Sequence, residues 1–196
     1  MRLTPYYSRY GLWLLLGVPL ALITYWYLNE KISYGDYIQH TGRFSVWLLL
    51  LTLAVTPLRQ LFPGRGWSRR LVQYRRYFGV ASFAYALPHV LAYVIRKETF
   101  ALVAEEAAYP ELWTGWLAMA IFLPLALSSN NWAVRRLGRT WKHLHRLVHL
   151  AALLTFAHWV LSAFDPLTAY LHLAVLGLLE AVRLWKSYGP RGRALQ

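Results

Sequence analysis

The chain has 196 residues, of which 58% are hydrophobic, 16% aromatic and only 15% charged, with 21 Lys and Arg against eight Asp and Glu. The formal charge of +13 alone would suggest a nucleic-acid binder, but the mean hydropathy of +0.32 indicates that most residues prefer an apolar solvent. This composition excludes a soluble globular protein. The lack of cysteine excludes disulfides, cysteine-ligated zinc, iron–sulfur clusters and covalently attached haem, and leaves histidine as the strong metal ligand.

Six apolar segments are long enough to cross a bilayer, whose hydrocarbon core needs about 20 residues of helix. In chain order they cover residues 11–28, 44–62, 77–95, 112–128, 143–164 and 167–185. The first is too long for a secretory signal and is followed by Asn29-Glu30-Lys31 where small residues should precede a cleavage site, so we expect it to be retained. The sequence shows no internal repeat and no nucleotide-binding glycine motif. It predicts one all-α domain over residues 1–196, an integral membrane bundle of six transmembrane helices.

Basic residues are distributed unevenly between the connections, and cytoplasmic connections collect Lys and Arg. One set, formed by both tails and the second and fourth connections, contains Arg2, Arg9, Arg59, Arg65, Arg69, Arg70, Arg75, Arg76, Arg135, Arg136, Arg139, Lys142, Arg183, Lys186, Arg191 and Arg193. The other set contains only Lys31, Arg43, Arg96 and Lys97, diluted by acidic residues. We therefore expect both termini in the cytoplasm. The charge is then explained by topology and by the anionic lipid bilayer, so no nucleic acid is expected as a partner.

Histidines inside apolar spans are functional candidates, because ionisable or metal-ligating groups are costly in a bilayer. At 1.5 Å per residue, His89 lies roughly 18 Å along its helix from Tyr77, and His158 reaches a similar depth in the outer half of the membrane. Two imidazoles at one depth on different helices are what a b-type haem requires, because its iron takes two axial ligands from opposite sides. The alternative for each histidine is a hydrogen bond to a neighbouring helix.

A second group of candidates lies near the cytoplasmic side. His145 precedes His158 by thirteen residues, roughly 20 Å of helix, and is assigned to an inner haem or a quinol site. Arg76 stands where a second ligand on the third helix is expected, and His149, one turn from His145, is the alternative ligand. Arg75 and Arg76 serve either topology alone or a cationic site for flavin phosphate or haem propionates.

Polar residues near the outer side have their own candidate roles. Arg43 is assigned to the connection before the second span and is a candidate anchor for a haem propionate or an acidic partner, because arginine is scarce there. His40 and His172 are assigned to a partner, a quinone or a propionate rather than to iron. His143 is assigned to the membrane interface.

Several segments, taken in their order and spacing, resemble the MsrQ family. They are Ile38-Gln39-His40-Thr41-Gly42-Arg43, Thr56-Pro57-Leu58, Arg75-Arg76-Tyr77-Phe78-Gly79, Leu137-Gly138-Arg139-Thr140-Trp141-Lys142-His143-Leu144-His145-Arg146-Leu147 and the His145/His158 spacing. The family comprises the haem-binding membrane subunits of the bacterial MsrPQ methionine sulfoxide reductase systems, a branch of the ferric-reductase-like transmembrane proteins. The similarity extends over nearly the whole chain.

The resemblance implies a cytochrome of the bacterial inner membrane with one or two b-type haems, and FMN is also associated with the family. It implies that electrons from the quinol pool, with quinone as the redox partner, or from a cytosolic flavin reductase pass outward to MsrP. MsrP is a periplasmic molybdopterin enzyme that repairs oxidised proteins by reducing methionine sulfoxide. His89, His145 and His158 occupy the family's haem-histidine positions. The chain is then an electron-transfer subunit with no catalytic residue of its own.

Three other functions compete with this reading. A stand-alone ferric-reductase-like oxidoreductase would pass electrons from cytosolic flavin to external iron chelates without a partner. A histidine-based proton relay or transition-metal transporter would use the same residues and leave the protein colourless. A structural anchor is disfavoured by the number of histidines inside the spans.

Overall fold

A computed structural model describes residues 6–97 and 99–188, so the terminal charges at Arg2, Arg191 and Arg193 lie outside the described residues. All regular secondary structure in these two ranges is helical. Within the described residues, six stretches are long and apolar enough to cross a membrane: Tyr10–Leu28, Tyr34–Leu61, Gly66–Arg96, Pro110–Leu127, Arg139–Ser162 and Leu167–Tyr188. The prediction of an all-α fold with six spanning helices is confirmed.

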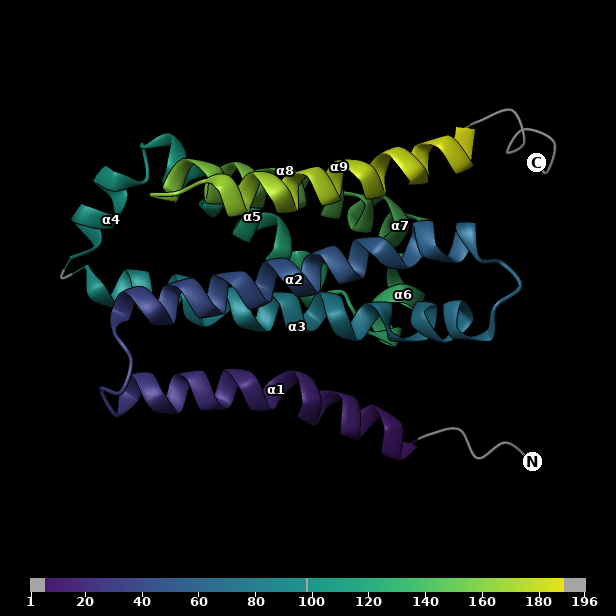
Figure 1. Ribbon diagram of the computed structural model, residues 1–196, viewed down its shortest axis with the longest axis horizontal. Helices are drawn as coiled ribbons and strands as arrows, with labels where there is room; N and C mark the ends of the chain where they lie inside the picture. The colour runs from purple at the N-terminus through teal and green to yellow at the C-terminus, as the bar shows by residue number, and fades with distance from the viewer. Residues whose placement is uncertain (1–5, 98, 189–196) are drawn as a thin grey trace.

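The six spans and the short helices between them follow one another along the chain (Figure 1). They are α1 (Tyr6–Leu28), α2 (Tyr34–Leu61), α3 (Gly66–Arg96), α4 (Phe100–Glu106), α5 (Pro110–Leu127), α6 (Asn131–Leu137), α7 (Arg139–Arg146), α8 (Val148–Ser162) and α9 (Leu167–Tyr188). The fifth span consists of α7 and α8, with Leu147 between them. Gly138 separates α6 from α7 and has a φ of 52°, a conformation that glycine adopts without a steric penalty.

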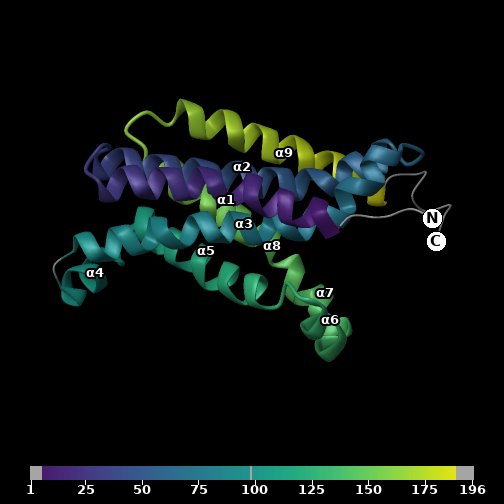
Figure 2. The ribbon, with the colours of Figure 1, turned by 90° about the horizontal axis from the view of Figure 1, so that it is seen from below.

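The two ends of the bundle differ in charge. The start of α1, the α2–α3 connection, α6, α7 and the end of α9 lie at one end (Figures 1 and 2). We call this the basic end, because it carries Arg65, Arg69, Arg70, Arg75, Arg76, Arg135, Arg136, Arg139 and Lys142. The α1–α2 connection, α4 and the α8–α9 connection lie at the other end. We call it the pocket end, because a pocket between α2, α3, α5 and α8 opens there.

The second span begins ten residues earlier than the sequence analysis predicted, so His40 and Arg43 lie on α2 rather than in a connection. Ser33 and Asp36 form a capping box: the Ser33 hydroxyl accepts a hydrogen bond from the Asp36 backbone, and Asp36 accepts one from the Ser33 backbone. The prediction was wrong because it followed hydropathy, whereas the helix start is set by this polar cap. α2 also continues as a helix through Pro57.

Two helix pairs form the framework of the bundle, α2 with α3 and α5 with α8. In the first pair Ser45 and Ser82 exchange hydrogen bonds, each hydroxyl donating to the backbone carbonyl of the other residue over 2.9 Å. Small hydroxyl residues allow such close approach between membrane helices. The main apolar cluster joins the two pairs to α9 through Val46, Leu49, Leu50, Leu53, Phe122, Ala151, Ala152, Phe156 and Leu176. The helix α1 packs outside α2 and α3, where the Tyr85 hydroxyl donates to the Leu16 carbonyl.

Candidate functional site

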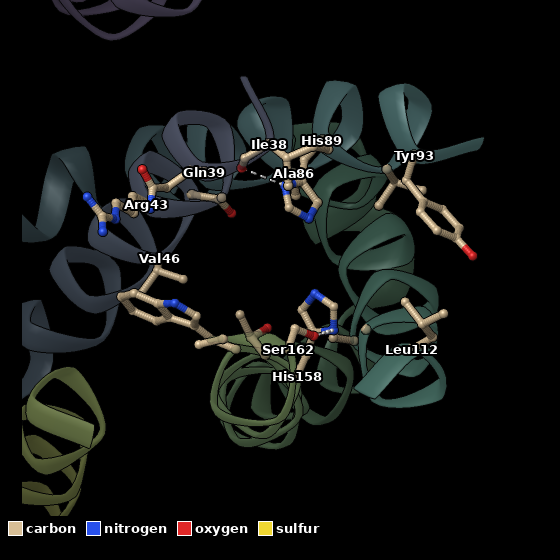
Figure 3. Close-up of a pocket in the computed structure, with 18 of the residues that line it drawn as sticks. Ile38, Gln39, Arg43, Val46, Ala86, His89, Tyr93, Leu112, His158 and Ser162 are labelled. Atoms are coloured by element: carbon tan, nitrogen blue, oxygen red, sulfur yellow. Dashed lines mark hydrogen bonds between the residues drawn. The ribbon is translucent and has the colours of Figure 1, made fainter. Parts of the chain in front are cut away.

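A pocket of about 650 Å³ opens at the pocket end between α2, α3, α5 and α8. Figure 3 shows its walls and the side chains that face it. The lining is mostly apolar and aromatic, and its polar groups include Gln39, Arg43, Tyr93, His89, His158, Ser162, Asp165 and Thr168. A concave apolar cavity with a small number of convergent polar groups is the usual form of a cofactor site.

His89 on α3 and His158 on α8 face each other across this pocket (Figure 3). Their ring centres are 6.3 Å apart and their ring planes are nearly perpendicular, at 88°. The two residues are 69 positions apart in the sequence, and it is the packing of the two helix pairs that brings them together. The structure therefore places on one cavity the two histidines that the sequence assigned to a common depth.

A backbone carbonyl holds each of these imidazoles at its Nδ1 atom. Nδ1 of His89 is 3.0 Å from the Ile38 carbonyl oxygen on α2, and Nδ1 of His158 contacts the Glu111 carbonyl oxygen on α5. A carbonyl oxygen can only accept, so Nδ1 carries the proton and Nε2 keeps its lone pair in both rings. Neither Nε2 atom has a hydrogen-bond partner among the described residues. Both rings are thus free to ligate through Nε2.

The dimensions of the pair fit a metal held between the two rings. Two metal–imidazole bonds of about 2 Å each place the ring centres roughly 6 Å apart, which is close to the distance observed here. The surrounding pocket is large, mostly apolar and open at one end, as a planar macrocycle with charged edge groups requires. The residues present therefore fit a b-type haem with two axial histidines.

Arg43 lies on the α2 wall of the same pocket (Figure 3). It is partly buried, and it comes one turn after Gln39 on the face that borders the cavity. A guanidinium in this place can pair with a carboxylate of a bound ligand. Arg43 therefore lines the same pocket as the two histidines, on α2 rather than in the connection where the sequence analysis put it.

His145 lies outside this pocket, on α7 at the basic end. Its Nε2 atom is 3.0 Å from the Ser128 hydroxyl, and its ring stacks on Trp141 with 3.9 Å between centres. Trp141 in turn donates to the Ser128 carbonyl. No second histidine ring contacts His145 in the described part of the chain. The residues around His145 therefore do not form a bis-histidine site like that of His89 and His158.

The two arginines predicted near His145 do lie near it. Arg75 and Arg76, both on α3, are within electrostatic range of the His145 ring on α7. Arg76 also donates to the Asn131 side chain over 2.8 Å, which connects α3 to α6. The basic end thus brings together one imidazole and two guanidinium groups.

A polar cluster joins α8 to α9 near the basic end, and the sequence analysis missed it. Glu180 accepts from Nδ1 of His149 over 2.7 Å and pairs with Arg183 over 2.6 Å. Glu180 is an acidic residue inside the sixth apolar span, and this alone was a signal that it has a buried partner. His149 was the alternative ligand for the inner site, and its Nδ1 atom is bonded to the Glu180 carboxylate.

His40, His143 and His172 are not among the residues that line the pocket. His172 uses both ring nitrogens within the bundle, since Nε2 accepts from the Trp47 indole over 3.1 Å and Nδ1 donates to the Thr168 carbonyl over 2.7 Å. It therefore has no ring nitrogen left for a quinone, a propionate or a partner. His40 and His143 are exposed on the surface of the described bundle.

Comparison with known proteins identifies the family to which the chain is similar. The family model described as "Ferric reductase like transmembrane component" matches residues 41–156, which include Arg43, His89 and His145. Similar curated proteins are the protein-methionine-sulfoxide reductase haem-binding subunits MsrQ of Brucella ovis, Brucella canis and Brucella suis. Each is 32% identical to this chain over 98% of its length and 93% of the relative. No solved structure matches the chain.

Six spanning helices and a ferric-reductase-like region indicate a multi-pass membrane protein. Both the family match and the near full-length similarity agree with the all-helical fold. The chain belongs to the MsrQ family of haem-binding subunits of methionine sulfoxide reductases, within the ferric-reductase-like transmembrane proteins.

Proposed function

We propose that the chain is the haem b electron-transfer subunit of a methionine sulfoxide reductase system, in which His89 and His158 would hold the haem iron. The observation that carries the proposal is the facing imidazole pair, with both Nε2 atoms unprotonated and directed into one pocket. When bound there, the haem supplies a one-electron carrier that stays in place while it is reduced and reoxidised. The chain supplies no catalytic residue for sulfoxide reduction.

The residues of the pocket have separate tasks in this proposal. The Ile38 and Glu111 carbonyls fix the rotation of the two rings, and hydrogen bonding at Nδ1 raises the basicity of Nε2. The apolar walls exclude water and keep the local dielectric constant low, so that electrostatic interactions with the charge of the metal site are strong. Arg43 is proposed to pair with a propionate at the mouth of the pocket.

The direction of electron transfer follows from the charge of the two ends. Cytoplasmic ends of membrane bundles are rich in Lys and Arg, so we assign the basic end to the cytoplasm and the pocket end to the periplasm of a bacterial inner membrane. The haem pocket then opens toward the periplasm, where the molybdopterin subunit MsrP would accept electrons and repair oxidised proteins. The relatives are named as subunits of a methionine sulfoxide reductase, which supports a partner of this kind.

Electrons are proposed to enter at the basic end, near His145, Arg75 and Arg76. Either the membrane quinol pool or a cytosolic flavin reductase can serve as the donor. Arg75 and Arg76 offer guanidinium groups that suit the phosphate of FMN, and FMN is proposed as a cofactor here. His145 is proposed to belong to this entry site, in which a haem would need a second ligand from outside the described contacts.

The test is the visible absorption of detergent-purified protein, oxidised and then reduced with dithionite, with haem and flavin measured per polypeptide. Wild type is compared with His89→Ala, His158→Ala and His145→Ala, and with His143→Ala as a control at an exposed histidine. We expect a Soret band with sharp reduced α and β bands that is lost in the His89 and His158 variants and kept in the control. A protein that stays colourless when expressed with ample haem overturns the proposal and favours proton or metal transport.

The family match also favours a second candidate, a stand-alone ferric-reductase-like oxidoreductase. Under this alternative the same haem pocket would deliver electrons to ferric chelates at the pocket end. The two functions differ in their need for a partner. Rapid reduction of a ferric chelate by the purified, reduced protein alone supports the alternative, whereas oxidation that depends on added MsrP supports the subunit role.

A further inference from the structure

The two histidines of the pocket are held by the same local arrangement, built twice. Thr41-Gly42 on α2 faces His89, and Thr114-Gly115 on α5 faces His158. In each case the residue three positions before the threonine provides the carbonyl that accepts the histidine Nδ1–H: Ile38 for His89 and Glu111 for His158. The sequences around the two Thr-Gly pairs are otherwise different.

The glycine of each pair lies directly against the imidazole. A β-carbon on Gly42 would be 3.2 Å from Cε1 and 3.3 Å from Nδ1 of His89. On Gly115 it would be 2.9 Å from Nδ1 and 3.1 Å from Cε1 of His158. A β-carbon on Gly115 would therefore require the His158 ring to shift, whereas on Gly42 the His89 ring would need to give by only a few tenths of an ångström.

The threonine of each pair shares the carbonyl that the histidine uses. The Thr41 hydroxyl donates to the Tyr37 carbonyl over 2.7 Å and to the Ile38 carbonyl over 3.2 Å. The Thr114 hydroxyl does the same with the Pro110 carbonyl over 2.8 Å and the Glu111 carbonyl over 3.2 Å. Both threonines are buried. A carbonyl oxygen that accepts from two donors forms a weaker hydrogen bond with each of them. The threonine hydroxyl therefore weakens the hydrogen bond that the histidine Nδ1–H donates to the same carbonyl.

We propose that Thr41-Gly42 and Thr114-Gly115 are positioning residues that set the orientation and basicity of the two imidazoles, and through them the affinity and potential of the haem. The proposal rests on the haem-binding function proposed above. The glycines set the ring position by allowing contact with the helix backbone, and the threonines set the strength of the Nδ1–H bond. A more basic imidazole stabilises ferric over ferrous iron, so a stronger Nδ1–H hydrogen bond lowers the reduction potential of the iron.

The glycine variants test the position of the rings. Gly115→Ala and Gly42→Ala are compared with Gly177→Ala, where a β-carbon meets nothing within 4 Å, and Gly79→Ala, where it meets Thr52 at 3.5 Å. We expect about 10-fold or greater loss of haem affinity for Gly115→Ala, a smaller loss for Gly42→Ala, and none for the controls. Since alanine is the better helix former, the loss should come without a loss of helical content.

The threonine variants test basicity and keep the proposal falsifiable if an alanine variant does not fold. Thr41→Val and Thr114→Val remove the competing hydroxyl, so we expect the haem midpoint potential to fall relative to wild type. Thr52→Val is the matched control, because Thr52 is buried and donates to Leu48 but does not line the pocket. Spectroelectrochemistry gives the potentials. Electron paramagnetic resonance of the ferric protein reports changes in the angle between the rings, 88° here.

The outcomes separate this proposal from the proposed function. A wild type that binds no haem overturns both. A wild type whose haem depends on His89 and His158, with all four variants matching their controls in affinity, potential and resonance spectrum, overturns only the role of the Thr-Gly pairs. Graded haem loss in the glycine variants together with lower potentials in the threonine variants supports it.

Discussion

Trp47 on α2 donates its indole N–H to Nε2 of His172 on α9, with 3.1 Å between the nitrogen atoms of two residues 125 positions apart. The His172 ring also packs against Trp159, with 5.1 Å between ring centres, and Trp159 lines the pocket that contains His89 and His158. One histidine therefore fastens the last helix to the second and supports a wall of the pocket from behind. This is a structural role for a residue that the sequence placed among ligand-binding candidates.

We expect His172→Phe to lower the free energy of unfolding by about 1 kcal/mol or less, because hydrogen bonds between membrane helices contribute modestly. Phenylalanine keeps a ring against Trp159 but cannot accept from Trp47. The measurement is unfolding by sodium dodecyl sulfate in mixed micelles, in a double-mutant cycle with Trp47→Phe. Additive effects of the two substitutions would contradict a direct interaction.

Neutralising Arg43 should weaken haem binding without unfolding the bundle. Arg43→Gln removes the charge on the α2 wall of the pocket, and a charge-assisted hydrogen bond at a partly exposed site contributes about 1 kcal/mol, or roughly fivefold in affinity. The rate of haem transfer to apomyoglobin measures the effect. Arg69→Gln, an exposed arginine of the basic end, is the control. Equal transfer rates for both variants would exclude a propionate contact at Arg43.

The short helix α4 should loosen from α3 in acid. Hydrogen bonds from Lys97 and from Tyr93 hold the pKa of Glu106 below its ordinary value of 4.5. A lowered pKa in the folded state means that the contact stabilises the fold above the unfolded value and is lost as the pH falls through the folded value. Hydrogen exchange of α4, corrected for intrinsic rates, should therefore rise as the pH falls below about 4.

Substitution of the carboxylate provides the control for this acid effect. Glu106→Gln should show the faster exchange of α4 already at neutral pH, and Glu105→Gln, at an exposed neighbour, should behave as wild type. If Glu106→Gln keeps the protection of the wild type at neutral pH, the carboxylate does not hold α4 in place.

The Glu180 carboxylate should be needed for the α8–α9 contact. Glu180→Gln leaves His149 and Arg183 facing a neutral amide in a partly buried place, and we expect a loss of about 1–2 kcal/mol in the free energy of unfolding. Glu30→Gln, at an exposed residue in the α1–α2 connection, is the matched control. Denaturant titration of both variants measures the difference. Haem content in the pocket should not change, because Glu180 does not line it.

Hydropathy, counted residue by residue, was enough to predict six spanning helices, because the transfer of each helix into lipid depends on its own composition. The rise of 1.5 Å per residue was likewise enough to put His89 and His158 at one depth. Where the start of a helix depended on a polar cap, as at Ser33 and Asp36, hydropathy alone misplaced it. The helix that Ser33 and Asp36 cap begins ten residues before the apolar run from which the span was predicted.

The sequence by itself thus determined the span count, the asymmetry of charge and the depth of the histidines, because these are sums over local segments. Only the tertiary structure decided which way each helix is turned and which neighbour it meets. As a result, His172 is bonded to Trp47 and His149 is bonded to Glu180. The Nε2 atoms of His89 and His158, in contrast, face one cavity. The rotation of a helix is fixed by close packing and by hydrogen bonds between residues far apart in the chain, such as His158 and the Glu111 carbonyl beside Gly115.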